Sequence, residues 1–366
     1  MFTTFVAMLN ECVRLGLASG DFSYEGVKRT CHARMGDYPI GYEYQISAIY
    51  QASNLLKKFR TDSAKRKVET PHCRNPHLAV SIGVGLSGNM LDLPTLGQVA
   101  LTQHSVSVLR QEGVALTSVT LTPTTCSVIY HKAVDQIVPR GALAVDVNLD
   151  NATTCDTRGV VTCYDLKDLT RIHETYRRVK SRFRRNDRRV RKRLFRKYAD
   201  LEHDRNSAIL HRASARIVKG AVAQRQGIVL EDLRGLREMY TRSSGGSSYY
   251  LSKMNAWPFH QLLSQVAYKA EWAGLPVCIV SPEWTSEKCS SCGGSMKRPP
   301  VEDDVVVCMA CGLVIDRDIN GAKNILKRGL RSRPAWFAGE AMIGGQAAER
   351  GPNARVDANH PASHPK

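Results

Sequence analysis

The chain has 366 residues, 43% of them hydrophobic, which is enough for about two or three compact domains with at least one sizeable core. Lys and Arg number 52 against 34 Asp and Glu, so the net charge is +18, and this excess favours nucleic acid as the partner. A membrane surface is the alternative, but no stretch approaches the roughly 18 to 20 uninterrupted apolar residues that span a bilayer. The composition therefore predicts a soluble protein with no membrane partner.

The N-terminus does not resemble a secretory signal, because Glu11 and Arg14 interrupt its apolar residues and no basic segment precedes them. The chain has 11 cysteines, and the tight clustering of some of them in two CxxC pairs argues against a disulfide framework. A reducing cytoplasm is the compartment that this pattern favours.

Two modules are expected before residue 142. Residues 1–66 carry apolar positions at helical spacing followed by a basic end, which predicts a helical module. Residues 67–141 contain segments such as QVALTQHS and VALTSVTLTP that alternate apolar with small or hydroxyl residues. This alternation between turn signals predicts a small module of short antiparallel strands.

From residue 142 the pattern is that of a mixed α/β sheet. ALAVDV and VVTCYDL are predicted to be adjacent strands joined by a polar turn, NLDNATTCDTRG, before a long basic helical region, 166–225. GIVLEDL and PVCIVS are further predicted strands, separated by the loop RSSGGSS and a helix that stops at Gly274. Residues 142–281 are thus expected to form one α/β core. The Gly-, Ala-, Pro- and His-rich residues 329–366 are expected to be a disordered tail.

Two CxxC pairs within residues 282–315 predict a metal site made of Cys289, Cys292, Cys308 and Cys311. Four thiolates can close a tetrahedral zinc site and leave no open position for chemistry, so the metal is expected to be structural. Redox dithiols are the alternative interpretation. A redox pair occurs more often once and beside a thioredoxin-like βαβ unit, and this sequence has neither feature.

Three carboxylates follow or interrupt predicted strands. Asp146 lies inside the apolar ALAVDV, Glu231 ends the apolar IVLE, and Asp318 lies in DRDINGAKNIL at a predicted loop-to-helix junction. Each by itself is explained as well by a helix cap or a salt bridge. Converging carboxylates, however, are what Mg²⁺ needs to hydrolyse a phosphodiester.

The segments AVDVNLDN, IVLEDL, YKAEWAGLPVCIVSPEWTSEKCSSCG and DRDINGAKNIL resemble, in order, the three RuvC-like motifs and the zinc ribbon of the TnpB (OrfB) family of bacterial and archaeal insertion sequences. Type V CRISPR effector nucleases share this arrangement. The resemblance covers about residues 142–327. It implies an α/β fold with an RNase H-like (RuvC) core, completed by residues 316–328 after an inserted zinc ribbon and preceded by the helical and β modules.

The resemblance also implies a function and its residues. The protein is expected to be a transposon-associated RNA-guided DNA endonuclease of the prokaryotic, nucleoid-associated cytoplasm. Its partners would be a guide RNA from the element and a double-stranded DNA target, gripped in part by the two N-terminal modules. Asp146, Glu231 and Asp318 would be the catalytic acids that bind Mg²⁺ or Mn²⁺ in a two-metal-ion mechanism, with Asp316 as the weaker candidate. Asn148 departs from the family, because many relatives have Gly there.

The basic region is expected to line the nucleic-acid channel. The residues expected to contact phosphates are Arg177, Arg178, Lys180, Arg182, Arg184, Arg185, Arg188 and Arg189. The histidines His104, His131, His203 and His211 lack paired spacing, which favours surface or core roles over catalysis. The aromatic residues Trp257, Phe259 and Tyr268 lie at helical spacing, which favours core packing over base stacking.

Two other functions remain open from the sequence. One is a nuclease-inactive, RNA-guided DNA-binding repressor, against which the presence of all three acids argues. The other is a zinc-ribbon nucleic-acid-binding protein whose α/β core is only a scaffold. The label "transposase" would describe genetic context, since no Tyr or Ser recombinase constellation is apparent.

Overall fold

The computed structural model describes residues 1–65, 67–75, 77–183, 187–233, 257–299, 304–332 and 356–357. The chain divides into two compact units, the first made of Met1–Ala133 with Ala347–Lys366 and the second of Val134–Gln346. Among the described residues, no helix has both the length and the apolar character needed to cross a bilayer.

Helices form the N-terminal half of the first unit. They are α1 (Phe2–Ser19), α2 (Tyr24–Cys31), the 3₁₀ helix η1 (His32–Asp37) and α3 (Tyr42–Ser63). Phe5 and Leu9 of α1 and Tyr44 and Leu56 of α3 are almost fully buried, so these two helices share an apolar core. Gly16 makes this packing close, because a Cβ there would lie 2.4 Å from Cδ1 of Leu56.

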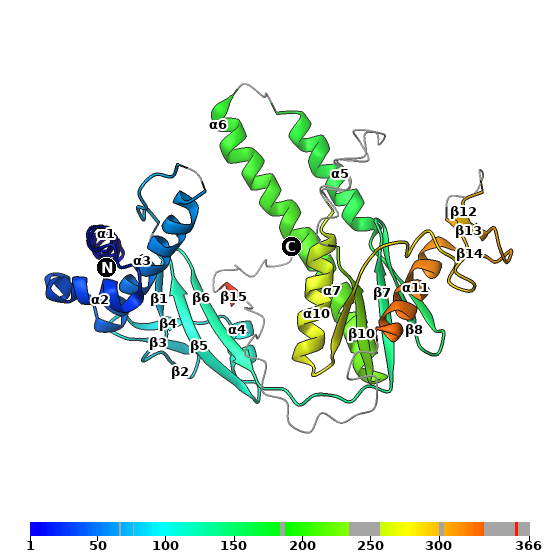
Figure 1. The fold of residues 1–366 in the computed structure, drawn as a ribbon, viewed down its shortest axis with the longest axis horizontal. Helices are drawn as coiled ribbons and strands as arrows, with labels where there is room; N and C mark the ends of the chain where they lie inside the picture. The colour runs from blue at the N-terminus through cyan, green and yellow to red at the C-terminus, as the bar shows by residue number, and fades with distance from the viewer. Residues whose placement is uncertain are drawn as a thin grey trace, which may run out of the picture. The chain divides into compact units, whose positions relative to one another are not determined.

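Two antiparallel sheets follow in the first unit (Figure 1). One pairs β1 (Leu78–Val80), β5 (Val114–Leu121), β6 (Cys126–Lys132) and the short β15 (Val356–Asp357), and the other pairs β2 (Gly85–Ser87), β3 (Met90–Leu93) and β4 (Gly97–Ala100). The expectation of a strand across QVALTQHS is wrong in its second half, where α4 (Gln103–Leu109) begins. The Thr102 hydroxyl caps this helix by accepting a hydrogen bond from the Ser105 amide at 3.1 Å.

A five-stranded sheet organises the second unit, in the order β11-β10-β7-β8-β9. Its strands are β7 (Gly141–Val147), β8 (Asn151–Asp156), β9 (Val161–Asp165), β10 (Gln226–Glu231) and β11 (Val277–Val280). Strand β10 runs parallel to β7 and β11, whereas β8 is antiparallel to β7 and β9.

The prediction that ALAVDV and VVTCYDL are adjacent strands joined by the polar turn NLDNATTCDTRG is wrong, because that segment contains strand β8, which lies between β7 and β9. The residues Ala152, Thr153, Thr154 and Cys155 of this strand are buried. Burial is tolerated because the hydroxyls are satisfied locally: Thr154 donates to the Thr162 carbonyl at 3.2 Å and Thr153 to Oδ1 of Asn151 at 3.1 Å. Satisfied Thr side chains fit a pleated strand as well as apolar ones do.

The basic helical region consists of two long helices with shorter elements between them. Helix α5 (Lys167–Ser181) and helix α7 (Arg196–Ala223) run antiparallel, joined through α6 (Arg188–Val190) and the π-helical turn η2 (Arg191–Phe195) (Figure 1). Helix α10 (Phe259–Trp272) packs beside α7. The prediction of a helix that stops at Gly274 is confirmed within one turn. Helix α10 ends at Trp272, and Gly274 has φ 79°, a left-handed conformation that does not continue a helix.

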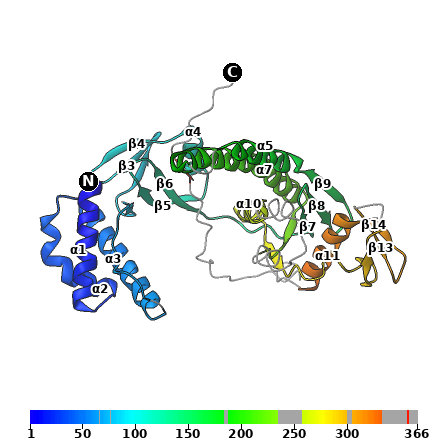
Figure 2. The same ribbon diagram turned by 90° about the horizontal axis from the view of Figure 1, so that it is seen from above.

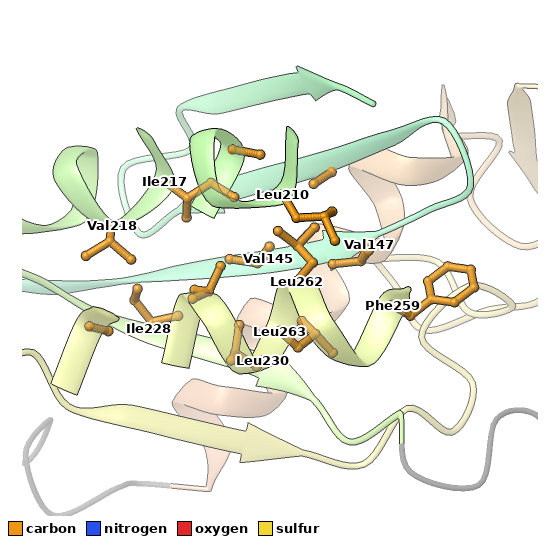
Figure 3. Close-up of a cluster of buried hydrophobic side chains, with 14 of the residues drawn as sticks. Val145, Val147, Leu210, Ile217, Val218, Ile228, Leu230, Phe259, Leu262 and Leu263 are labelled. Atoms are coloured by element: carbon orange, nitrogen blue, oxygen red, sulfur yellow. The ribbon is translucent and has the colours of Figure 1, made fainter. Parts of the chain in front are cut away.

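Alternate residues of β7 face two different cores. Leu143, Val145 and Val147 pack against α7 and α10 in the larger core (Figure 3), whereas Ala142 and Ala144 face helix α11 (Arg317–Arg331) in a smaller one. Figure 2 shows α10 and α11 on opposite sides of β7. Asp146 has the same strand parity as Ala142 and Ala144, so its carboxylate belongs to the face that α11 covers.

A smaller sheet of β12 (Met296–Lys297), β13 (Val305–Cys308) and β14 (Val314–Asp316) follows the first cysteine pair, and the second pair lies at the end of β13 and just after it. The loop predicted at RSSGGSS lies outside the described residues, as does most of the expected disordered tail. Within that tail, α11 continues to Arg331 and Val356–Asp357 pairs with β6.

The larger core should dominate the stability of the second unit. Leu262 of α10 is 0% exposed, so Leu262→Ala is expected to lower the free energy of unfolding by about 2–5 kcal/mol through lost burial and the cavity left behind. Ile279→Ala is the matched control, because that side chain is 61% exposed, and it should change stability by about 0.5 kcal/mol. Urea denaturation followed by circular dichroism measures both, and equal losses would contradict the assigned core.

Candidate active site and cysteine cluster

Strand register brings the first two acids together. Leu230 of β10 pairs with Val145 of β7, and the two strands are parallel, so the next residues, Glu231 and Asp146, lie side by side. Both point to the face covered by α11, because Val229, two residues before Glu231, packs in the core on that face. Sequence positions far apart therefore meet at neighbouring strand ends.

Asp146 is buried, with 9% of its surface exposed. The pKa of its carboxyl is raised to about 7, chiefly by burial and then by the charges of Glu231 and Asp318, while a hydrogen bond from Asn148 and the charge of Arg317 act in the opposite direction. The Asn148 amide donates to Oδ2 of Asp146 at 3.1 Å. The residue that departs from the family pattern thus contacts the first acid directly.

Glu231 is the second acid of the site and is half-buried. Its pKa is raised to about 7 by burial, while the Thr285 side chain and the positive charge of Arg328 act in the opposite direction. Its Oε1 is buried and has no hydrogen-bond partner among the described residues. A buried carboxylate oxygen without a partner is costly, and a bound cation is one way to satisfy it.

Asp318 reaches the same site from the first turn of α11. Its Oδ2 accepts a hydrogen bond from the Asn151 amide at 2.8 Å, and its Oδ1 accepts from Nε and Nη2 of Arg317, each at 3.1 Å. Asp316 has a different role, because its Oδ1 accepts from the amides of Asp318 and Ile319 at 2.9 and 3.0 Å and so caps the helix. The structure therefore separates the two acids of the DRD segment.

The three carboxylates form one electrostatic group, since the charges of Glu231 and Asp318 both act on Asp146. Their oxygens are the ligands that Mg²⁺ and Mn²⁺ take. Within the described part of the chain, only the cysteine cluster brings three or more ligand atoms within 4.8 Å of one another, so the acids are spaced more widely than that. The raised pKa values and the unpartnered Glu231 oxygen nevertheless fit a site that holds cations.

Sequence reasoning missed three residues of this site. Asn151 and Arg317 orient Asp318, and Gly321 of α11 lies against Asp146, where a Cβ would come 2.7 Å from Oδ2. Asn151 was hidden by its assignment to a turn. The NG of DRDINGAKNIL was visible in the sequence, but a glycine inside a helical pattern indicates a close approach without saying to what.

The four predicted cysteines do meet. Their sulfurs lie within 4.8 Å of one another, with Sγ distances of 3.8 Å from Cys289 to Cys311 and 3.5 Å from Cys292 to Cys308. A zinc tetrahedron with Zn–S bonds of about 2.3 Å has S···S edges of about 3.8 Å, which these distances approach. The cluster can therefore hold a metal ion.

Backbone amides point at these sulfurs. Ser291 and Gly294 donate to Cys289 and Cys292, each at 3.4 Å. The corresponding bonds of the second pair, from the Cys311 and Ala310 amides, lower the pKa of Cys308 to about 6, which favours the thiolate. Gly293 and Gly312 follow the two knuckles with φ 81° and 72°, a conformation that glycine adopts without strain.

The expected phosphate-binding residues do not share one environment. Arg177, Arg178, Arg182 and Arg188 are exposed, whereas Lys180 donates to Glu202 at 2.6 Å and is 24% exposed. Arg184 and Arg185, and the side chain of Arg189, lie outside the described residues.

An open hollow of about 1320 Å³ lies along α6, η2 and α7. Its lining residues are Arg188, Lys192, Arg193, Arg196, Lys197, Asp200, Leu201 and Asp204. Four of its five basic residues come after Arg189, the last residue expected to bind phosphate. These four residues could have been predicted from the sequence, because the run of basic residues continues to Lys197.

The aromatic prediction is confirmed for two of its three residues. Trp257 and Phe259 are 4% and 8% exposed and their rings lie 4.1 Å apart, so they pack in the core. Tyr268 is only partly buried.

Known proteins resemble this chain in sequence and in fold. The family model for the Cas12f1-like TNB domain matches residues 259–325. A TnpB-like protein of Methanocaldococcus jannaschii is 31% identical over 194 residues, which cover 51% of this chain and 68% of that protein. A putative RNA-guided DNA endonuclease of Streptomyces pristinaespiralis is 29% identical over 194 residues, which cover 52% of this chain but only 45% of that protein.

A solved structure, Cas12f1 in complex with sgRNA and target DNA, has a similar fold. It aligns with a TM-score of 0.58 and 10% identity over 88% of this chain and 80% of that one. At this identity the likeness extends to the fold alone.

The raised pKa of Asp146 predicts a pH-dependent stability. A carboxyl whose pKa rises from 3.8 to about 7 on folding binds its proton more tightly in the folded state, so its contribution to the free energy of unfolding falls as pH rises between these values. Urea denaturation without added divalent ions should therefore show a steeper loss of stability from pH 5 to 8 in the wild type than in Asp146→Asn.

Asp168→Asn is the matched control, because the Asp168 side chain is 62% exposed and its removal should leave the pH dependence of the wild type unchanged. Identical pH profiles for the wild type and Asp146→Asn would contradict the burial of this acid.

Proposed function

The chain belongs to the TnpB family, and on that basis we propose that it is an RNA-guided DNA endonuclease that cuts at the site of Asp146, Glu231 and Asp318. The observation that carries the proposal is that three acids from segments far apart in sequence lie on one face of the sheet, and that two of them, the buried Asp146 and the half-buried Glu231, have raised pKa values. A purely structural sheet gains nothing from two ionisable carboxyls placed side by side and withdrawn from water.

The α/β core is proposed to be RNase H-like (RuvC). Three antiparallel strands, β7 to β9, are followed by two strands parallel to β7, in the order β11-β10-β7-β8-β9. This order puts the first acid on the central strand and the second on its parallel neighbour. In the domain scheme that we propose, residues 142–281 and 316–328 form this core, residues 282–315 the zinc ribbon, and residues 1–66 and 67–141 the modules that recognise nucleic acid.

Asp146, Glu231 and Asp318 would hold two Mg²⁺ or Mn²⁺ ions, which supply the activation of water and the stabilisation of the leaving oxygen. The protein's own contribution is orientation. Asn148 fixes one oxygen of Asp146, and Asn151 and Arg317 each hold a different oxygen of Asp318. The raised pKa values of Asp146 and Glu231 mean that cation binding competes with protons, so activity should fall below about pH 7.

The cysteine cluster is proposed to hold a structural Zn²⁺. All four sulfurs belong to the cluster, and amide donors already surround them. A site closed in this way orders the protein and leaves the chemistry to the carboxylates.

Guide RNA and DNA are proposed to lie along the basic hollow of α6 to α7. Its five Lys and Arg residues face two Asp residues, Asp200 and Asp204, which leaves an excess of positive charge suited to a phosphate backbone. Contacts of this kind give affinity without sequence information, which fits a protein whose specificity comes from guide pairing.

Cleavage is the direct test. The protein, purified with the RNA encoded beside its gene, should cut a matched double-stranded DNA in Mg²⁺, and Asp146→Ala should reduce the rate by at least about 10³-fold, because the first ligand of the cations is lost. Asp168→Asn should cut like the wild type. A wild type that binds its target yet cuts with no divalent ion would contradict the endonuclease function and favour an RNA-guided repressor.

Salt dependence tests the hollow. The double change Lys192→Ala and Arg196→Ala removes two lining cations, so it should weaken RNA binding and lower the slope of log K against log salt by about 0.7 for each phosphate that is no longer neutralised. Filter binding at several salt concentrations measures this slope. Arg171→Ala, which removes a 77% exposed cation of α5 already paired with Asp168, is the control; an equal drop there would mean that the hollow has no special role.

A further inference from the structure

Helix α11 contacts different parts of the second unit with its two faces. Ala322, Ile325 and Leu326 pack on the sheet in the smaller core. The opposite face is polar and reaches back to the segment 281–291, which leads into the first cysteine knuckle. The side chains that make these bonds are Asn320, Asn324, Lys327 and Arg328.

Asn320 is the most buried member of this polar face, with 0% of its surface exposed. Its Oδ1 accepts a hydrogen bond from the Ser290 amide at 2.8 Å, and its Nδ2 donates to the Lys288 carbonyl at 2.9 Å. These two backbone groups flank Cys289. The Lys288 carbonyl also accepts from Nδ2 of Asn324 at 2.7 Å, whereas the Ser290 amide has Asn320 as its acceptor. Ala or Leu at position 320 would therefore leave the buried Ser290 amide unpaired.

The residues around Asn320 touch two of the three acids. Asp318 itself lies two positions earlier, and Gly321, the next residue, approaches Asp146 so closely that a Cβ would lie 2.7 Å from Oδ2 and 3.2 Å from Cγ. Residues 318–321 therefore meet the cysteine knuckle, the first acid and the third acid within one helical turn. The helix is packed closely against Asp146 at this point. A displacement of the first cysteine knuckle that moved α11 would therefore also change the position of α11 relative to Asp146.

The third link runs through Thr285. Its carbonyl accepts a hydrogen bond from Asn324 at 2.8 Å, and its hydroxyl, which donates to the Pro282 carbonyl at 2.9 Å, lies near enough to Glu231 to lower the pKa of that acid. Thr285 is buried, with 5% exposed. The segment held by α11 thus also reaches the second acid.

We propose that Asn320 is a positioning residue which couples the cysteine cluster to the carboxylate site, so that the ordered knuckle sets the spacing of Asp318 and Asp146. The coupling rests on the proposed function, since it assumes that these acids bind divalent ions. Its consequence is that the metal ion of the cysteine cluster controls the affinity of the acids for Mg²⁺ or Mn²⁺. It does so indirectly, because the cysteines are not ligands of the carboxylate site.

The experiment is a Mn²⁺ titration of the full-length, zinc-loaded protein followed by electron paramagnetic resonance, with zinc content and thermal unfolding recorded for every variant. Binding that is present in the wild type and absent in Asp146→Ala defines the carboxylate site. Asn320→Ala should weaken this binding about 10–100-fold while keeping its zinc, as loss of a residue that orients metal ligands does.

Lys327→Ala is the matched control. Lys327 also bonds the knuckle, at the Ser290 and Ser291 carbonyls, but nearly two helical turns from Gly321, so its loss should change Mn²⁺ affinity less than about twofold. Cys311→Ser, which removes one ligand of the cluster, should lose zinc and weaken Mn²⁺ binding together.

Three results would overturn the coupling: Mn²⁺ affinity of wild-type strength in Asn320→Ala, loss of zinc in that variant, or zinc loss in Cys311→Ser without any change in Mn²⁺ affinity. If Asn320→Ala does not fold, Asn324→Ala is tested in its place. Mn²⁺ binding about 3–10-fold weaker than in the wild type is expected. Binding of wild-type strength would overturn the proposal. A wild type with no Mn²⁺ binding dependent on Asp146 would instead contradict the proposed function.

Discussion

Asp146 and Glu231 lie side by side at the ends of two parallel strands, on the face that α11 covers, and this proximity of two acids constrains the rest of the second unit. Burial raises the pKa of both carboxyls, and the charge of Glu231 further raises the cost of ionising Asp146. Such an arrangement persists only where the surrounding structure holds it. Here the apolar packing of β7 and β10 against α7 and α10 supplies the stability that the acids subtract.

The division of β7 into two faces makes this arrangement possible. Large aliphatic residues on one face build the main core, while Ala142 and Ala144 on the other leave space for α11 to approach. Gly321 and Gly329 do the same from the helix side, with Gly329 lying against Val229. Small residues on both partners bring the helix N-terminus, and with it Asp318, over the strand that carries Asp146.

Helix α11 thereby connects the two candidate metal sites. Its capped N-terminus presents Asp318, its apolar face fixes the helix to the sheet, and its polar face binds the backbone that leads into the first knuckle. The cysteine cluster and the carboxylates are then linked through one helix. This gives a physical reason for the cysteine pairs to lie between β11 and the helix that carries the last acid: the first knuckle is bonded to that helix.

The sequence by itself determined the candidate site residues and the α/β class of the second unit. Four cysteines in two CxxC pairs have few other uses, an acid in an apolar strand is costly anywhere, and neither inference requires knowing which strands are neighbours. The order of the motifs then identified the family. Local patterns failed where tertiary contacts override them: the Thr-rich β8 resembles a turn until its hydroxyls find partners, and the end of QVALTQHS becomes helical once Thr102 caps it.

What only the tertiary structure decided is how these residues meet. Strand register sets Glu231 beside Asp146, and the cap by Asp316 selects Asp318 as the acid that turns toward the sheet. The roles of Asn151, Gly321 and Asn320 depend on partners more than 30 residues away or on another element, as with Asn151 and Asp318, separated by 167 positions. Hydrophobic periodicity and composition describe only a residue's neighbours along the chain. These contacts are made between residues that are neighbours in space, so the sequence pattern could not predict them.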